Sequence, residues 1–577
     1  MNSLENFIID NIKIKVKHIY HLEIDRKNLE ESLYLCDNLS IGHYTFKCFN
    51  LAKELKSSPL NIANSLLDYF FNMDLFDSVN AVNGYLNFKI KVNHLAQESY
   101  SIPNSFNEIN LSKKVVIEYS QPNTHKELHV GHMRNLCLGN SLCRIKSYLG
   151  YDVISATYPG DVGTHVAKCL WYIKNRYIGN LPSHNKGEWL GNIYAKANAA
   201  LLDENNDPEI AKENKAELTL ILKEIEAKSG SYYQLWLVTR EWSLELMRSI
   251  YSWADVTFDK WYFESEVDKP SIELCNSLFE KGLLIKSDGA IGMDLRDLDL
   301  GFCMLIKSDG TGLYATKDIE LAKVKHDNFN PDQSIYVVDN RQSFHFEQVF
   351  NVLERIGFED SKKCVHLKYE MVELPDGAMS SRKGNIIPIS SLINRMEETI
   401  KDKYLSKNCD WNNDEIDKVA SQIANGAIKY GMLKFDPNKK IIFNFDDWLR
   451  IDGDTGPYIQ YSATRANSIL NNNADFNLDT VDNFDFTYCN DIEIELLVKL
   501  LSFDNSVRKA NQLNKPSIIA NYSYELAQIF NKFYANINIR HIDNIDEKIQ
   551  KLILVKNFYL RIGICLNLLG IVIPSRM

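Results

Sequence analysis

The spacing of apolar residues changes along the chain and divides it into regions. Near the start, a helical pattern in FNLAKELK and NIANSLLDYFF is followed by YLNFKIKV, in which every second residue is apolar. Alternation of this kind is typical of a strand with one buried face, and the preceding Asn83-Gly84 pair favours a tight turn. We expect residues 1–105 to form a small α+β domain that ends in the linker SIPNSFNEIN.

A second pattern begins near residue 113, where the short apolar run KKVVIEYS predicts a buried strand. The loop QPNTHKEL follows, then a helical pattern that ends near Gly150, then the strand-like YDVISATY. This order is typical of a parallel nucleotide-binding sheet. We expect an α/β, Rossmann-like parallel-sheet domain over 106–390, with a charged helical insertion at about 170–265. The sheet is expected to resume in FCMLIKSDGTGLYATKD, SIYVVDN and CVHLKYEMVEL.

The last third of the chain has the apolar spacing of helices throughout. We expect a helical connector over 391–450 and an all-helical domain over 451–577. In the latter, one stripe of residues at helical spacing is interpreted as packing: Leu526, Ile529, Phe530, Phe533 and Tyr534. The long apolar stretch 552–573 contains Lys556 and Arg561, which are costly in a lipid bilayer, so we interpret it as a core helix rather than a membrane span.

Composition narrows the class of protein further. The chain has 577 residues, 45% of them hydrophobic, which is ordinary for several globular domains. Its 11 cysteines show no CxxC spacing, and the N-terminus lacks the apolar core of a secretory signal. We therefore expect reduced thiols, a cytoplasmic location and no structural zinc. The net charge of −11 argues against a protein that binds nucleic acid over most of its surface, but it permits a local basic surface that does so.

The motif His129-Val130-Gly131-His132 follows the first expected strand and opens the next helix. Histidines three positions apart lie on one helical face. Free N–H groups and the dipole at a helix N-terminus favour an anion, and Gly131 lets a ligand approach the backbone closely. We interpret the motif as a triphosphate site in which His129 and His132 donate hydrogen bonds, with two ordinary surface histidines as the alternative.

A second motif, MSSRKGN at 379–385, lies between the turn LPDGA and the strand-like IIPI. Hydroxyl groups and cations in a mobile loop suit transient binding of phosphates. Alone, such a stretch is typical of any solvated loop. Together with HVGH it is a specific pair.

This pair resembles the two signatures of class I aminoacyl-tRNA synthetases, and its context resembles the arginyl-tRNA synthetase family in particular. The resemblance extends over nearly the whole chain, from NLAKEL and GYLNFKI near the N-terminus to the C-terminal end. It is carried by EYSQPNTHKELHVGHMRN, YPGDVGTH, TGLYATKD, DGDTGPYIQYSATRANSI, NYSYELAQIFNKFY and LNLLGIVIPSRM. It implies an arginine–tRNA ligase that forms arginyl-adenylate from ATP, transfers arginine to the 3′-terminal adenosine of tRNA, and needs bound tRNA for activation.

The resemblance also implies an arginine pocket. Glu118 and Asn123 match positions at the α-amino end, and three others match positions at the guanidinium end: Tyr314, Asp318 and Gln342. A guanidinium is a planar fork of five donors and therefore needs planar acceptors. Sites of this kind reject analogues that lack the fork by roughly 10⁴–10⁵, so we expect no editing domain. For Asp318 the alternative is a pair with Lys317 or Lys325, or solvation.

The expected ATP site departs from the family pattern in its second signature. The first lysine of that signature is Ala378 here and the central one is Ser381, so the resemblance implies Lys126 as the main phosphate cation and Lys383 as the second. Asp161 is either part of this site or a helix cap. ATP is expected as its Mg²⁺ complex, with no tightly bound cofactor. Residues assigned to ATP are His129, Gly131, His132, Gly160, Asp161, Met371, Ser380, Ser381 and Lys383.

The partners implied are tRNA, L-arginine and ATP, with no membrane and with a monomer as the family default. The N-terminal domain is expected to contact the corner of the tRNA through Asn87, and the C-terminal domain to read unpaired anticodon bases. The candidates in the C-terminal domain are Tyr458, Tyr461, Arg465, Asn521, Tyr524 and Met577.

Three alternatives remain open at this point. The first is a class I synthetase for another amino acid, against which Glu118 and Asp318 in one pocket would argue. The second is a small nucleotidyltransferase with the same HxGH motif, although such enzymes need no RNA-reading domain. The third is an inactive, synthetase-like RNA-binding protein, supported only by Ala378.

Overall fold

The computed structural model describes residues 2–36, 38–100, 112–375, 377–378, 387–406, 411–476, 478, 486 and 488–577. The expected linker SIPNSFNEIN lies outside the described residues, as does the whole of the MSSRKGN loop. Within the described part of the chain, no helix is both long and apolar enough to cross a membrane.

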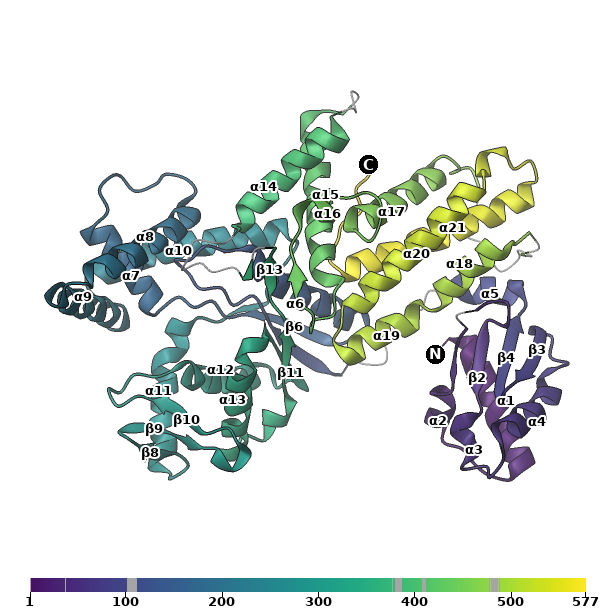
Figure 1. The fold of residues 1–577 in the computed structure, drawn as a ribbon, viewed down its shortest axis with the longest axis horizontal. Coiled ribbons are helices and arrows are strands. Elements are labelled where there is room, and N and C mark those ends of the chain that lie inside the picture. The colour runs from purple at the N-terminus through teal and green to yellow at the C-terminus, as the bar shows by residue number, and fades with distance from the viewer. Residues whose placement is uncertain are drawn as a thin grey trace.

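The N-terminal region is a four-stranded antiparallel sheet in the order β1-β2-β4-β3, with helices against it (Figure 1). Asn83 and Gly84 both have left-handed backbone, at φ 51° and 82°, and join β3 to β4 in a tight turn as predicted. The elements are α1 (Ser3–Tyr20), α2 (Arg26–Glu30), β1 (Leu33–Leu35), β2 (Tyr44–Lys47), α3 (Phe49–Ala52), α4 (Pro59–Phe70), β3 (Phe76–Val82), β4 (Tyr85–Ile90) and α5 (Val92–Tyr100).

The central sheet has five parallel strands in the order β12-β11-β5-β6-β7. The chain adds strands on one side of β5 and later on the other, so the strand order reverses beside β5. Ligands of open parallel sheets bind at the carboxyl ends of the strands beside such a reversal. The Rossmann-like prediction is confirmed by β5 (Lys114–Glu118), α6 (Val130–Tyr148), β6 (Asp152–Thr157), β7 (Lys260–Trp261), β11 (Gln333–Asp339) and β12 (Cys364–Tyr369).

The predicted helical insertion is present between β6 and β7, and its helices lie to one side of the sheet (Figure 1). They are α7 (Thr164–Asn175), α8 (Lys186–Glu204), α9 (Pro208–Glu226) and α10 (Ser231–Trp253).

One prediction about the sheet is wrong. The apolar run FCMLI forms β10, which pairs antiparallel with β9 in a separate three-stranded sheet instead of rejoining the parallel sheet. Its outer face is open, with Met304 42% exposed, so the run is not buried on both sides as a parallel strand would be. This unit contains α11 (Glu264–Glu280), β8 (Ile285–Ser287), β9 (Ala290–Asp294), η2 (Arg296–Leu298), β10 (Phe302–Ile306), α12 (Tyr314–Phe329), η3 (Asn340–Gln342), α13 (Ser343–Arg355) and η4 (Glu359–Lys363).

The described remainder of the chain is almost entirely helical, as predicted. Four residues of the predicted stripe are buried, whereas Tyr534 is 42% exposed. The elements are β13 (Val372–Leu374), β14 (Gly377–Ala378), α14 (Ile389–Ile400), η5 (Lys401–Leu405), α15 (Asn413–Leu433), β15 (Ile441–Ile442), α16 (Phe445–Trp448), α17 (Gly456–Asn471), α18 (Asp491–Leu501), α19 (Phe503–Leu513), α20 (Ser517–Asn536), η7 (Ile539–His541) and α21 (Ile545–Leu568).

The N-terminal domain docks on helices near the other end of the chain. Asn557 of α21 donates to Ser99 Oγ at 3.1 Å, Arg561 donates to the Ser99 carbonyl at 3.1 Å, and Asn505 of α19 donates to Glu5 at 2.9 Å. Figure 1 shows α5 beside α18 at this junction. These buried polar contacts fix the N-terminal domain against the helical C-terminal domain.

Candidate active site

The N-terminus of α6 is built from the two signature histidines. His129 is the N-cap residue, and its Nδ1 accepts a hydrogen bond from the Gly131 N–H at 3.2 Å. His132 Nδ1 accepts from the His129 N–H at 3.0 Å, and the two ring centroids are 4.0 Å apart. Because each Nδ1 is an acceptor, the proton of each neutral ring is on Nε2. The sequence HVGH therefore presents two imidazole N–H donors beside a helix N-terminus.

Burial keeps both rings neutral. It lowers the pKa of His129 to about 4, with a further contribution from Arg341. Burial and the neighbouring His129 lower the pKa of His132 well below its usual value. Neutral N–H donors can stabilise a developing anion without a proton being lost or gained.

The buried histidines predict how folding depends on pH. Burial lowers the pKa of His129 to about 4 and the pKa of His125 and of His165 to about 3, whereas an unfolded chain has histidine pKa values near 6.5. The unfolded state therefore binds more protons below about pH 6.5, and stability is lost as the pH falls. We expect the free energy of unfolding to drop between pH 7 and pH 5, by about 2 kcal/mol per such histidine. Thermal unfolding followed by circular dichroism measures this, and an unchanged Tm would contradict it.

The second signature is described only at its edges. Ser380, Ser381 and Lys383 lie outside the described residues, whereas Ala378 ends the short strand β14, which pairs with β13. On the other side, Val130 N–H donates to Ile387 O at 3.0 Å and Ile389 N–H donates to Leu128 O at 2.9 Å. The expected strand at IIPI is therefore limited to these contacts, since α14 begins at Ile389. Residues 387–389, which follow the loop in the sequence, lie directly beside HVGH.

Met371 precedes this loop in the sequence and is bonded to α6. Its carbonyl accepts from Arg134 of α6 at 3.3 Å, and the same guanidinium also donates to the carbonyls of Pro437 and Lys439. Arg134 is fully buried, and burial lowers its pKa to about 10. Arg134 thus ties the start of β13 to the helix that carries the histidines.

Two loops meet where Asn123 forms a parallel bridge with Gly160. The Thr124 N–H donates to Gly160 O at 2.9 Å, and the Gly160 N–H donates to Pro122 O at 3.2 Å. A Cβ atom at Gly160 would overlap Asn123 Oδ1 and lie 3.3 Å from Glu264 Oε1. Gly160 is therefore needed for the close approach of the loops that follow β5 and β6.

Asp161 is fully buried and its carboxylate is saturated. It accepts from Arg240 Nε at 2.7 Å, from the Ser265 N–H at 2.9 Å and from the Ser265 hydroxyl at 2.7 Å. The helix-cap alternative is wrong, because α7 is preceded by Gly163 and has no side-chain cap. Asp161 instead joins α10 to the start of α11, which holds the PGDVG turn in place.

Three carboxylates, those of Asp318, Glu264 and Glu118, act electrostatically on the buried Tyr158 hydroxyl. Burial raises the pKa of Tyr158 well above its usual value, and Asp318, Glu264 and Glu118 raise it further. This hydroxyl is buried and has no hydrogen-bond partner among the described residues. A polar ligand with several donors would satisfy both the orphaned hydroxyl and these carboxylates.

Asp318 pairs with neither Lys317 nor Lys325, the two lysines considered as its partners from the sequence. Its Oδ2 lies 2.6 Å from His345 Nε2. Lys325 instead forms a fully buried pair with Glu118 Oε2 at 2.7 Å, while Lys317 pairs with Glu264 at 3.4 Å and with Asp268 at 3.1 Å. Glu118 and Asp318 thus have different partners, Lys325 and His345.

Tyr314 and Gln342, the other two residues expected at the guanidinium end, both have exposed side chains. Tyr314 is the first residue of α12 and is 70% exposed, one turn before Asp318 on the same helix. Gln342 ends η3 just beyond β11 and is exposed. The helix expected for LYATKDIELAKV is confirmed, but neither side chain is enclosed by the protein.

Sequence reasoning missed three residues of the site: Tyr158, Glu264 and His345. Burial raises the pKa of Glu264 to about 7, although Lys317 opposes the rise. An acidic residue inside the aromatic run WYFESEV was the available signal for Glu264. His345 carries no local signal, because only the packing of α13 against α12 brings it to Asp318.

Comparison with known proteins shows the family of the chain. The family model described as tRNA synthetases class I (R), catalytic domain, matches residues 97–445. An arginine–tRNA ligase of Bdellovibrio bacteriovorus is 46% identical over 544 residues, which are 93% of this chain and 92% of the relative. That of Clostridium botulinum is 32% identical, over 96% of this chain and 98% of the relative.

The chain belongs to the arginyl-tRNA synthetase family.

Two further models cover the outer domains of this synthetase-family chain. The arginyl tRNA synthetase N terminal domain matches residues 6–90, and the DALR anticodon binding domain matches 459–577. The solved arginyl-tRNA synthetase of Thermus thermophilus has the same fold, with a TM-score of 0.82 and 24% identity over all of both chains.

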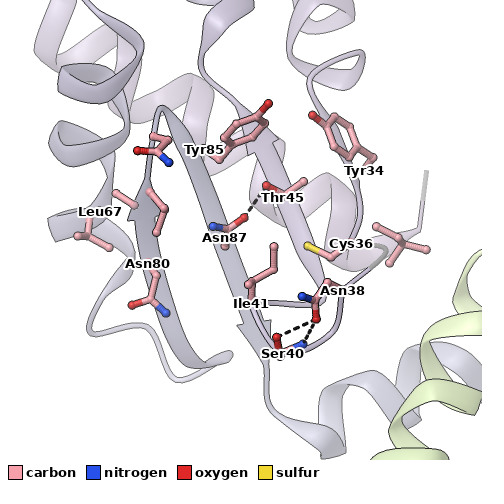
Figure 2. Close-up of a pocket in the computed structure, with 14 residues that line it drawn as sticks. Tyr34, Cys36, Asn38, Ser40, Ile41, Thr45, Leu67, Asn80, Tyr85 and Asn87 are labelled. Carbon is pink, nitrogen blue, oxygen red and sulfur yellow. Dashed lines mark hydrogen bonds between the residues drawn. The ribbon is translucent and has the colours of Figure 1, made fainter.

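The N-terminal domain of the synthetase has a cavity of about 760 Å³ on its sheet (Figure 2). Asn87 lies in its wall, and its Oδ1 accepts from Thr45 Oγ1 at 2.6 Å. Tyr34 and Tyr85 line the same cavity, and Lys47 Nζ lies 4.3 Å from the centroid of the Tyr34 ring. Aromatic rings, an amide and a nearby cation are the groups that bind an unpaired base.

The C-terminal domain has a second cavity, of about 580 Å³, between α17 and the end of α20. Arg465 lines it and lies between two aromatic rings, 4.5 Å from the Tyr461 centroid and 4.4 Å from that of Tyr534. Tyr461 is 37% exposed and Asn521 is exposed on α20. Tyr458, Tyr524 and Met577 are instead partly buried against the core, and the rings of Tyr458 and Tyr524 are 5.6 Å apart.

Proposed function

We propose that this protein is an arginine–tRNA ligase that activates L-arginine with ATP and transfers it to the 3′-terminal adenosine of tRNA. The observation that carries the proposal is the pair of histidine donors at the N-terminus of α6, in a domain where the carboxylates of Glu118, Asp318 and Glu264 act on the buried, unpartnered Tyr158 hydroxyl. A flat cation with five donors suits these carboxylates, and an anion suits the helix N-terminus.

In the first step, a carboxylate oxygen of arginine attacks the α-phosphate of ATP in line, and pyrophosphate leaves. In the second step, a hydroxyl of the terminal ribose attacks the carbonyl of the adenylate, and AMP leaves. The protein forms no covalent intermediate, so the rate comes from positioning and from stabilisation of charge. His129 and His132 donate from Nε2 to the phosphate as its charge develops.

Asp318 receives the guanidinium, and the negative charge of Glu264 supports its binding. The exposed Tyr314 and Gln342 contact the arginine once it is bound. Asn123 and Glu118 face the α-amino end; Glu118 Oε2 pairs with Lys325, and Oε1 accepts from Gln121 Nε2 at 3.3 Å. This arrangement makes the substrate charge a requirement for binding.

Gly160 provides a test of the arginine end of the site. Replacing it by alanine should displace Asn123, because the new methyl group overlaps the amide oxygen. We expect the KM for arginine to rise about tenfold through the loss of one charge-assisted hydrogen bond. The control is Gly563→Ala in α21, whose added methyl group has its nearest neighbour at 3.8 Å. An unchanged arginine KM in Gly160→Ala would remove Asn123 from the site.

ATP enters as its Mg²⁺ complex, in which the ion is held mainly by phosphate and water. No cluster of three or more His, Cys, Asp or Glu side chains suited to a metal is found in the described ranges. Lys126 supplies the main cation to the triphosphate. Its charge also lowers the pKa of His132, although burial and His129 contribute more. Lys383, Ser380 and Ser381 contribute from the MSSRKGN loop.

We further propose that both outer cavities bind bases of the tRNA. The N-terminal cavity takes a base from the corner of the tRNA through Asn87, and the C-terminal cavity takes an anticodon base that stacks near Tyr461 and Arg465. Asn521 and the partly buried Tyr458, Tyr524 and Met577 shape that surface. Because the net charge is −11, such binding depends on local basic groups and weakens with salt.

Asn87→Ala should raise the KM for tRNA in the charging reaction about tenfold, since one base contact of about 1–3 kcal/mol is lost. Asn80→Ala, in the same cavity wall, is the matched control for cavity shape (Figure 2). Aminoacylation measured over a range of tRNA concentrations provides the comparison. Equal tRNA KM values for wild type and Asn87→Ala would exclude this cavity from tRNA recognition.

The deciding experiment is ATP–pyrophosphate exchange with each of the twenty amino acids, with and without tRNA. The proposal predicts exchange for arginine alone, and only when tRNA is present. Exchange for another amino acid would indicate a different class I synthetase. Exchange for none of them, with AMP transfer to a small acceptor or no activity, would favour the nucleotidyltransferase or the inactive RNA-binding protein.

We assign the units of the enzyme as residues 1–105 for the tRNA corner, 106–390 for catalysis, 391–450 for the connector and 451–577 for the anticodon. The protein acts in the cytoplasm as a monomer. Sedimentation of the purified chain with and without tRNA tests the last statement.

A further inference from the structure

The loop between β5 and α6 contains two residues with an unusual backbone. Ser120 and His125 have φ values of 56° and 58°, the left-handed region that costs a non-glycine residue energy. Such strain, of order 1–3 kcal/mol, persists only where the surroundings hold the residue in place. It also concentrates at functional sites, and this loop carries Asn123 and Lys126.

All four polar groups of His125 have partners inside the protein. The N–H donates to Ser243 Oγ at 2.9 Å, and the carbonyl accepts from Cys169 Sγ at 3.4 Å. The ring nitrogens lie 2.9 Å from Thr124 Oγ1 and 2.8 Å from Thr239 Oγ1. The side chain is fully buried. The surroundings therefore over-determine the position of this residue, as its backbone conformation requires.

All of these partners except Thr124 come from the helical insertion. Thr239 and Ser243 belong to α10 and Cys169 to α7. Arg240, which follows Thr239 in α10, donates a hydrogen bond to Asp161 in the loop after β6. One turn of α10 therefore holds both loops, the one that precedes HVGH through His125 and the PGDVG turn through Asp161.

Helix α8 fixes the residues that follow His125. A Cβ atom at Gly191 would lie 2.8 Å from Glu127 Cβ and 3.1 Å from its backbone nitrogen, so the helix lies against residue 127. Lys126 Nζ lies 5.3 Å from the ring centroid of Tyr194 on the same helix. The backbone at Lys126 is therefore held on both sides, through His125 before it and through Glu127 after it.

We propose that His125 is a positioning residue for adenylate formation: through Thr239 and Ser243 of α10 it fixes the strained turn from which Lys126 reaches the triphosphate. The inference rests on the proposed role of Lys126 as the phosphate cation. It assigns to the helical insertion the task of aligning a catalytic group, in addition to any contact with tRNA.

The chemistry of the ring suits this task. A protonated imidazole beside Lys126 would repel its ammonium group and shift it from the phosphate. Burial and, to a smaller extent, the charge of Arg240 lower the pKa of His125 to about 3, so the ring is neutral at working pH. A neutral ring bonded to two hydroxyl groups provides rigidity without adding charge.

The test uses two substitutions that leave Lys126 in place. His125→Gly removes the ring but adopts the left-handed backbone without strain. Thr239→Val removes one hydroxyl partner, and Thr239→Ser, which keeps the hydroxyl, is its matched control. We expect exchange kcat to fall about tenfold in His125→Gly and several-fold in Thr239→Val, because a small misplacement of a catalytic group is costly. Thr239→Ser should keep the wild-type kcat. In all three variants the KM for arginine should stay within twofold of the wild-type value.

The same His125→Gly change is then made in a Lys126→Ala background. If His125 acts through Lys126, the change costs less than twofold there. A tenfold loss in both backgrounds would overturn the inference, as would an unaltered kcat in His125→Gly. If Lys126→Ala alone leaves exchange unaffected, the proposed role of Lys126 fails, and the inference fails with it. Tm values for all variants identify any loss that comes from unfolding.

Discussion

His132→Ala should lower the rate of arginine-dependent ATP–pyrophosphate exchange by about 10²–10³. The substitution removes one of the two neutral N–H donors at the N-terminus of α6, and a donor of this kind typically contributes that factor. The binding of ATP should change much less, since the donor acts mainly on charge that develops during the reaction. Single-turnover adenylate formation at saturating ATP, arginine and tRNA measures the chemical step directly.

Two controls separate this effect from a loss of folding. His132→Asn keeps an acceptor for the His129 N–H and should retain the Tm while losing the rate. His184→Ala changes an exposed histidine and should leave both unaltered. A His132→Ala rate within threefold of wild type would show that the histidines of HVGH have no part in the chemistry.

Asp318→Asn should reduce kcat/KM for arginine by about 10²–10³ and leave the KM for ATP nearly unchanged. The amide keeps the shape of the side chain but removes the negative charge opposite the guanidinium, and an uncompensated charge in a partly buried site costs about 3–5 kcal/mol. Asp318 is 21% exposed, which favours the lower part of this range. Exchange measured against arginine concentration gives the ratio.

The matched control is Asp268→Asn on α11, an aspartate that pairs with Lys317 at 3.1 Å, whereas Asp318 pairs with His345. It should change arginine activation less than threefold. If the two variants behave alike, Asp318 does not read the guanidinium. Activation of a neutral amino acid by wild-type protein would contradict the arginine assignment altogether.

Features encoded by neighbouring residues were predictable from the sequence. The strand, loop and helix around HVGH, the Asn83-Gly84 turn and the helical insertion all follow from local apolar spacing and turn chemistry. The family motifs placed the candidate residues on these elements. This is why the position of His129 and His132 at the start of α6 agrees with the prediction.

Features that depend on distant partners were not predictable. The apolar run of β10 has the appearance of a buried parallel strand, and only its antiparallel pairing with β9 shows otherwise. The partner of Asp318 is His345 rather than either nearby lysine, because α13 packs beside α12. Likewise, Glu118 meets Lys325 across 207 residues of chain, which no local pattern encodes.

The docking of the N-terminal domain has a consequence for synthesis of the protein. Its contacts join Ser99 to Asn557 and Glu5 to Asn505, residues 458 and 500 positions apart. A ribosome therefore completes this domain long before the helices that receive it exist. Until then the nascent domain must keep its shape alone, with its docking face open to chaperones, and final assembly waits for the last helices to emerge.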